Sequence, residues 1–215
     1  MIERLGYKKI ILKSDNEPAI LALKEAVRRE TDVEIVTEEV PVADHQANGL
    51  VENAIKNVQG QFRVIKDALE SRHGRRIDGE HPVVPWMVMH AASVVNRSRK
   101  DDEGFSAYRR WKGREFTKPV AEFGECVLYA PAASAGKDKF DARWKEGVWL
   151  GVCMESGESL IGTDGGVVKA RDFRRKVENG GRWSVAEFDK FVGVPWEPYP
   201  GAKGGFLVSA TGPVN

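Results

Sequence analysis

The sequence predicts an α/β fold in which a parallel crossover unit and a long amphipathic helix precede a region of short strands. Three observations predict it. β-Branched runs at 7–13 and 33–37 flank a helix-forming segment, apolar residues recur at helical steps from Val51 to Leu69, and from about Pro119 short apolar runs alternate with Gly, Asp and Ser. Strand–helix–strand order favours parallel strands in one sheet. Short, evenly spaced strands favour a small antiparallel barrel or sandwich.

Composition limits the class of protein. The chain has 215 residues, of which 41% are hydrophobic and 30% charged, as in an ordinary globular protein. The net charge is only +1, so a nucleic-acid surface has to come from an uneven distribution of charge. No apolar run is long enough to span a bilayer, and an intracellular protein without a membrane partner is expected. Cys126 and Cys153 stand alone in apolar segments, which favours core thiols over a disulfide or a zinc site.

An acidic residue follows the first predicted strand. The run at 7–13 predicts a strand whose carboxyl end delivers Asp15, and Asn16 is a candidate cap for the helix that follows. The second strand, 33–37, leads through a polar loop to Glu52. Functional groups gather at the carboxyl ends of parallel strands, so we expect Asp15 and Glu52 to converge.

The long helix carries two stripes. The apolar stripe, which should pack on a core, consists of Val51, Ile55, Val58, Phe62, Ile65 and Leu69. The second stripe begins with an acid where the helix dipole tolerates it and continues with basic and amide groups: Glu52, Lys56, Gln59, Arg63 and Lys66. Two interpretations stay open for the second stripe. It is either an ordinary solvated helix face or a metal-binding carboxylate followed by cations for a phosphate backbone.

Later elements are shorter. The segment 85–97 predicts a largely buried helix in which His90 is a core or rim residue rather than a ligand. Ser106 is a candidate cap for a short helix, and Ser184 with Glu187 forms a capping-box pattern. Strand-forming runs lie at 122–131, 143–154, 158–163 and 166–173. Their aromatic residues, Trp144, Trp149 and Phe173, suit a core better than nucleic-acid stacking.

The spacing of the two acids suggests a metal. Asp15 and Glu52 are separated by 36 residues. Two carboxylates brought to one spot repel each other unless a cation lies between them, and hard oxygen ligands suit Mg²⁺ or Mn²⁺. In a two-metal site such carboxylates serve phosphoryl transfer, because the ions stabilise the attacking and leaving oxygens.

The chain resembles the retroviral-type integrase core of copia-type (Ty1/copia) retrotransposon polyproteins, which has the ribonuclease-H-like fold of DDE transposases. The matching motifs, in family order, are SDNE at 14–17, HQANGLVE at 45–52, VVNRS at 94–98, FSAYRRWKG at 105–113, EFGECVLYAP at 122–131 and KEGVWLGV at 145–152. The resemblance implies a partial ribonuclease-H-like core at 1–117, an SH3-like β domain at 118–176, and a short helix with an irregular tail at 177–215.

The resemblance also implies roles for individual residues. Asp15 matches the family's second catalytic aspartate and Glu52 its catalytic glutamate, which together would hold Mg²⁺ or Mn²⁺ for joining DNA 3′ ends. Asn48 falls in the loop before the glutamate. The cations and amide that follow on the helix would contact DNA, namely Lys56, Gln59, Arg63 and Lys66. The implied partners are DNA and, in a complete protein, further copies of the chain, with no small-molecule substrate and a nuclear location during action on DNA.

Two departures qualify the implied activity. Glu17 stands where family members commonly have Gly, and the family's first catalytic aspartate, well upstream of the second, has no counterpart here. We therefore expect this chain to be inactive in DNA joining by itself. A non-catalytic nucleic-acid-binding module and a decayed element relic are the alternatives. A ribonuclease-H-like nuclease fits the same carboxylates, but the NGLVE and NR motifs favour an integrase.

Overall fold

The computed structural model describes residues 2, 6–14, 17–39, 49–131, 143–177 and 181–201. The chain forms two compact units, Met1–Asn57 and Val58–Asn215, which are described separately below. The division falls within helix α2 (Gly49–His73). The domain boundaries expected from the family resemblance, after residues 117 and 176, both lie inside the second unit and stay predictions.

The first unit contains the predicted crossover. Strand β1 (Lys9–Ser14), helix α1 (Pro18–Arg29) and strand β2 (Glu34–Glu39) follow one another, and the two strands pair in parallel. The register runs from Lys9 opposite Glu34 to Ser14 opposite Glu39. The prediction of a parallel strand–helix–strand unit is therefore confirmed, with strand ends within two residues of those expected.

Helix α1 begins differently from the expectation. Its N-cap is Glu17, whose side chain makes no capping hydrogen bond, and Pro18 occupies the first helical position. Proline suits this position because its fixed φ is already helical and the missing N–H would have no intrahelical acceptor. Asn16, the predicted cap, lies outside the described residues.

Helix α2 is longer than predicted and is buried along only part of its length. Leu69 is buried, and Phe62 and Ile65 pack against the same core. Val51 and Ile55 are 56% and 50% exposed. The prediction that one continuous apolar stripe packs on a core is thus correct for the C-terminal half of the helix and wrong for its first two turns. Periodicity identifies a helix face but not how much of it finds a partner.

The second unit is built on a five-stranded antiparallel sheet with the order β6-β5-β4-β3-β7. Its strands are β3 (Cys126–Tyr129), β4 (Lys145–Val152), β5 (Ser159–Thr163), β6 (Gly166–Ala170) and β7 (Phe173–Arg175). Only residues 171 and 172 separate β6 from β7, although these two strands occupy opposite edges. Such a link spans about 11 Å, whereas the edges of a flat five-stranded sheet are about 19 Å apart. The sheet must therefore curl strongly.

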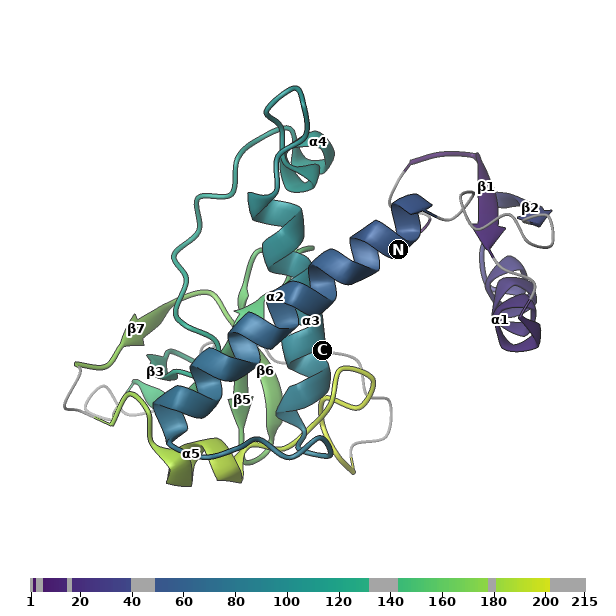
Figure 1. Cartoon of the computed structure of the whole chain (residues 1–215). Helices are drawn as coiled ribbons and strands as arrows, with labels where there is room; N and C mark the ends of the chain where they lie inside the picture. The colour runs from purple at the N-terminus through teal and green to yellow at the C-terminus, as the bar shows by residue number, and fades with distance from the viewer. Residues whose placement is uncertain are drawn as a thin grey trace, which may run out of the picture. The chain divides into compact units, whose positions relative to one another are not determined.

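Both faces of this sheet are covered. On one face Leu69 of α2 and Trp86 and Met87 of helix α3 (Val83–Ser98) share a core with Val148 and Leu150 of β4. Figure 1 shows α2 and α3 lying across the strands on this side. The opposite face has a smaller core around Trp149 and Ile161. Burial on both faces explains why β4 reads as a continuous apolar run rather than an alternating one.

Two short helices have the predicted caps. In α4 (Ala107–Lys112) the Ser106 hydroxyl accepts a hydrogen bond from the Arg109 N–H at 3.1 Å. In α5 (Val185–Lys190) the Ser184 hydroxyl accepts one from the Glu187 N–H at 3.3 Å. In a capping box the Glu187 side chain would also bond back to the backbone N–H of Ser184. Here the Glu187 carboxylate pairs with the Lys190 ammonium at 2.6 Å instead.

Candidate nucleic-acid interface and metal site

Of the two predicted catalytic carboxylates, the structure describes one. Glu52 lies in the first turn of α2, where the helix dipole favours a negative charge. Its side chain is 55% exposed, and its Oε2 is 3.9 Å from the Nζ of Lys56, one turn further along. Asp15 and Asn48 lie outside the described residues, so the predicted convergence of Asp15 on Glu52 stays a prediction.

A divalent ion needs more ligands than the described residues gather. Among them no group of three or more His, Cys, Asp or Glu side chains could hold a metal ion. Glu52 supplies a single carboxylate, and the charged group beside it is the Lys56 ammonium, which opposes cation binding. The described residues alone therefore do not fit a Mg²⁺ or Mn²⁺ site, and a site would require Asp15.

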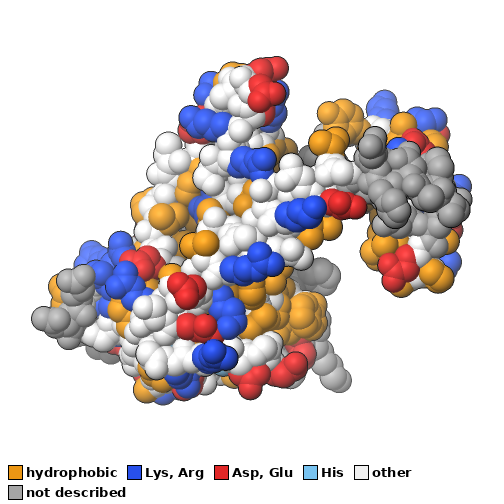
Figure 2. Space-filling view, in the orientation of Figure 1, with side chains coloured by type: hydrophobic (Ala, Val, Ile, Leu, Met, Phe, Trp, Pro, Cys, Tyr) orange, Lys and Arg blue, Asp and Glu red, His pale blue; other side chains and the backbone are white. Residues whose placement is uncertain are grey.

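The residues of the predicted nucleic-acid stripe differ in how far they are exposed. Lys56, Gln59 and Arg63 are exposed on α2, and Figure 2 shows Lys and Arg side chains spaced along this helix. Lys66 instead pairs with Glu70, one turn later. The Lys66 ammonium, helped by the Ile77 N–H, lowers the pKa of the Glu70 carboxyl. Lys66 thus contributes to the local structure, whereas Arg63 is exposed and Lys56 is 74% exposed despite its ion pair with Glu52.

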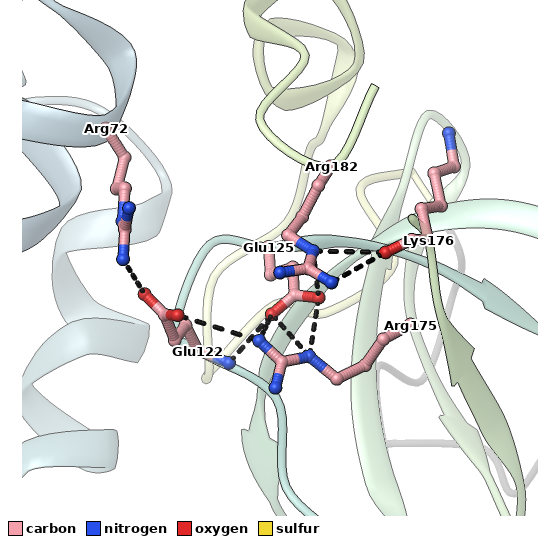
Figure 3. A network of polar contacts seen from close by, with 6 residues as sticks. All are labelled: Arg72, Glu122, Glu125, Arg175, Lys176 and Arg182. Atoms are coloured by element: carbon pink, nitrogen blue, oxygen red, sulfur yellow. Dashed lines mark hydrogen bonds and ion pairs between the residues drawn. The ribbon is translucent and has the colours of Figure 1, made fainter. Parts of the chain in front are cut away.

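A second set of cations surrounds a buried acid that the sequence analysis did not single out. Glu125 is completely buried just before β3. Arg175 of β7 approaches it from one side, with Nε 2.8 Å from Oε1 and Nη2 2.7 Å from Oε2. The Nε of Arg182 lies 3.3 Å from Oε1 (Figure 3). The hydrogen bonds to Glu125 raise the pKa of Arg175. Two guanidinium groups therefore share one carboxylate.

This network ties separate segments of the second unit together. The Arg182 guanidinium donates to the backbone carbonyl of Lys176 at 2.8 Å, and Arg72 of α2 reaches Glu122 at 3.2 Å (Figure 3). Nearby, the guanidinium of Arg174 stacks 4.4 Å from the ring centroid of Trp144. Around Glu125 there are more Lys and Arg than Asp and Glu side chains. This network therefore adds positive charge to the second unit, which also carries Arg63.

A sequence signal for the network exists. Glu125 interrupts the otherwise apolar run FGECVLY. A carboxylate in such a run either points to solvent or is buried with a cationic partner. The sequence does not say which cation it meets, because Arg175 is 50 residues away.

The histidine and cysteine expectations are confirmed. His90 is buried on α3 between the rings of Phe123 and Trp149, with Nδ1 lacking a hydrogen-bond partner among the described residues. Burial, assisted by Arg97, lowers its pKa to about 4. Gly151 makes room for it, because a Cβ there would lie 2.8 Å from Nδ1. Both cysteines are buried free thiols.

Comparison with protein-family models and with curated proteins gives no match for this chain. Within the described ranges, no helix combines the length and apolar character that crossing a membrane requires.

Proposed function

We propose that this chain is an integrase-related DNA-binding protein of retrotransposon origin. In this proposal the first unit and α2 belong to a ribonuclease-H-like core, and the curled sheet is an SH3-like domain. The observation that carries the proposal is the parallel pairing of β1 with β2. In the sequence Asp15 directly follows Ser14, the last residue of β1, and helix α2, which comes after β2, carries Glu52 in its first turn. This is the order of elements that the family resemblance implies.

DNA binding would rest on phosphate contacts from α2. Lys56 and Arg63 are exposed cations on α2, and Gln59 between them offers an amide donor. Such contacts position a protein on the duplex without reading its sequence. We therefore expect DNA binding that depends only weakly on the DNA sequence and strongly on the salt concentration.

A binding assay with matched variants tests this proposal. Fluorescence anisotropy with a labelled DNA duplex is measured for the wild type and for Lys56→Gln/Arg63→Gln. Each lost phosphate contact weakens binding, so we expect the double variant to bind at least roughly tenfold less tightly. The control is Arg28→Gln/Arg29→Gln, which removes the same charge from exposed positions on α1. Equal losses in both double variants would reduce the effect to net charge and contradict a role for α2.

The catalytic part of the proposal concerns DNA 3′-end joining. Asp15 and Glu52 would hold Mg²⁺ or Mn²⁺, which supplies Lewis-acid stabilisation of charge at the reacting phosphate. Because the chain is expected to be inactive by itself, the assay uses it joined to the upstream strands and aspartate of the family core. Strand transfer in Mg²⁺ that is lost in Glu52→Gln and kept in Glu25→Gln would support the assignment. Equal activity of Glu52→Gln and the unsubstituted protein would overturn it.

A non-catalytic nucleic-acid-binding module is the second candidate. It is favoured by the Lys56 ammonium 3.9 Å from Glu52, which neutralises the described carboxylate. This candidate predicts salt-sensitive DNA binding that neither Mg²⁺ nor Glu52→Gln changes. Strand-transfer activity would exclude it.

A further inference from the structure

The two strands of the first unit carry complementary patterns of charge. On the exposed face β1 presents Lys9, Ile11 and Lys13, and β2 presents Glu34, Val36 and Glu38. Each lysine pairs with the glutamate opposite, Lys9 with Glu34 at 2.6 Å and Lys13 with Glu38 at 3.1 Å. A cation–apolar–cation row of side chains on β1 thus lies beside an anion–apolar–anion row on β2.

The same two patterns also border the outer edges of this sheet. The Glu34 N–H donates to the Lys8 carbonyl at 3.0 Å. Since bonded residues alternate along a parallel pair, the backbone groups of Lys9, Ile11 and Lys13 point to the other edge of β1. Within the described residues no strand pairs with that edge or with the outer edge of β2. Unpaired edges of this kind are templates for strand addition.

Apolar exposure marks the same place. Ile11 is 65% exposed and Val36, directly opposite it, is 38% exposed. The other face of the sheet is better covered: Ile35 is buried, and the Lys24 ammonium of α1, itself buried, donates to the Glu38 carbonyl at 3.2 Å. A two-stranded sheet is at best marginally stable, so an additional strand would be strongly stabilising.

We infer that the first unit self-associates by edge-to-edge strand pairing, with β2 of one copy adding to the outer edge of β1 in the next. The occupant is a second copy of this chain because the chain itself supplies the complementary edge. Lys9, Ile11 and Lys13 would meet Glu34, Val36 and Glu38 of the neighbour, repeating the intrachain pairs. This match requires parallel pairing, because in an antiparallel pair the outward-bonded residues of β1 would lie opposite Ile35 and Thr37 of the neighbour instead. The contact joins two different surfaces and is therefore head-to-tail.

This inference does not depend on the proposed function. It predicts that β1 does not pair with β1 of another copy, because Lys9 and Lys13 would then face like charges. Opposite charges across strands stabilise pairing and like charges oppose it. That distinction between unlike and like edges is the basis of the test.

The test uses a charge-swapped chain, Lys9→Glu/Lys13→Glu/Glu34→Lys/Glu38→Lys. The swap preserves each intrachain pair with its sign reversed, so the first unit is expected to fold, which circular dichroism checks. Donor- and acceptor-labelled full-length chains are then mixed, and association is measured by fluorescence energy transfer. We expect wild type with wild type and swapped with swapped to associate. The mixed pair, in which like charges meet at every junction, should associate at least roughly tenfold more weakly.

Other outcomes would overturn the inference. Mixed association stronger than either homotypic association would mean that like edges pair. Equal association in all three combinations would place the contact elsewhere. No association in any combination would exclude self-pairing, and this would also be the result if the edge binds a strand of another protein.

A second comparison probes the apolar centre of the contact. Ile11→Lys should weaken wild-type self-association, whereas Val64→Lys should leave it unchanged. Val64 is a matched control because it lies in the second unit and is 64% exposed, close to the value for Ile11. A similar loss in both variants would indicate nonspecific hydrophobic association and contradict strand pairing.

Discussion

The stability of the second unit should fall as the pH is lowered, and His90 should supply much of the loss. Burial lowers the pKa of His90 from 6.5 to about 4, so the folded unit disfavours the protonated ring. Stability from the neutral ring is complete above pH 6.5 and is lost as the pH falls toward 4, because the unfolded chain binds the proton first. At about 1.4 kcal/mol per pH unit the full loss is about 3 kcal/mol. Linkage places about 2.5 kcal/mol of it above pH 4.5.

Urea unfolding followed by tryptophan fluorescence measures this effect. All six tryptophans lie in the second unit, so the signal reports on it alone. His90→Met replaces the ring with an apolar side chain and should change stability at pH 7.5 by less than about 1.5 kcal/mol. The stability that the variant loses between pH 7.5 and 4.5 should be about 2.5 kcal/mol smaller than in the wild type.

A control and a refuting result complete the experiment. Met87→Leu alters a buried side chain of the same helix without removing a titrating group, so it should keep the wild-type pH dependence. The lowered pKa values of His73 and His81 leave some acid sensitivity in every variant. Identical pH dependence in His90→Met and the wild type would refute the assignment of the effect to His90.

Three further substitutions probe the packing and polar contacts. Glu125→Gln leaves Arg175 and Arg182 without their shared carboxylate and should cost about 1–3 kcal/mol in urea unfolding, because Arg175 is partly exposed to solvent; the half-exposed Glu122→Gln should cost less than about 1 kcal/mol, and equal costs would argue against the network. Leu69→Ala should cost about 3–5 kcal/mol in the same assay, whereas Val64→Ala, at an exposed position of the same helix and in the same unit, should cost far less. Ser106→Ala should destabilise α4 by about 0.5–2 kcal/mol, seen as faster hydrogen exchange of the Arg109 amide; unchanged exchange would contradict the cap.

Local signals predicted the elements well. The helical steps that end at Leu69, the cap at Ser106 and the β-branched runs of the first unit all correspond to elements of the structure. These signals act over a few residues, through backbone preference and the alternation of buried side chains. Order along the chain also predicted the parallel pairing, because a helix between two strands permits it.

Contacts between distant segments could not be predicted in the same way. The apolar stripe of α2 does not reveal that Val51 stays exposed while Leu69 is buried, since both fit the period. Nor does the sequence show that Glu125 is shared by Arg175 and Arg182, which meet it only after the sheet curls. The pairing of Asp15 with Glu52 stays a prediction because Asp15 lies outside the described residues.

The salt dependence of DNA binding tests the central claim most directly. The affinity of the wild type and of Lys56→Gln/Arg63→Gln for one duplex is measured across a range of salt concentrations, and the logarithm of affinity is plotted against that of salt. Each phosphate contact contributes about 0.9 to the slope. We predict a steep slope for the wild type that falls by about 2 in the double variant. A slope near zero in the wild type, or the same slope in both proteins, would contradict DNA binding through α2.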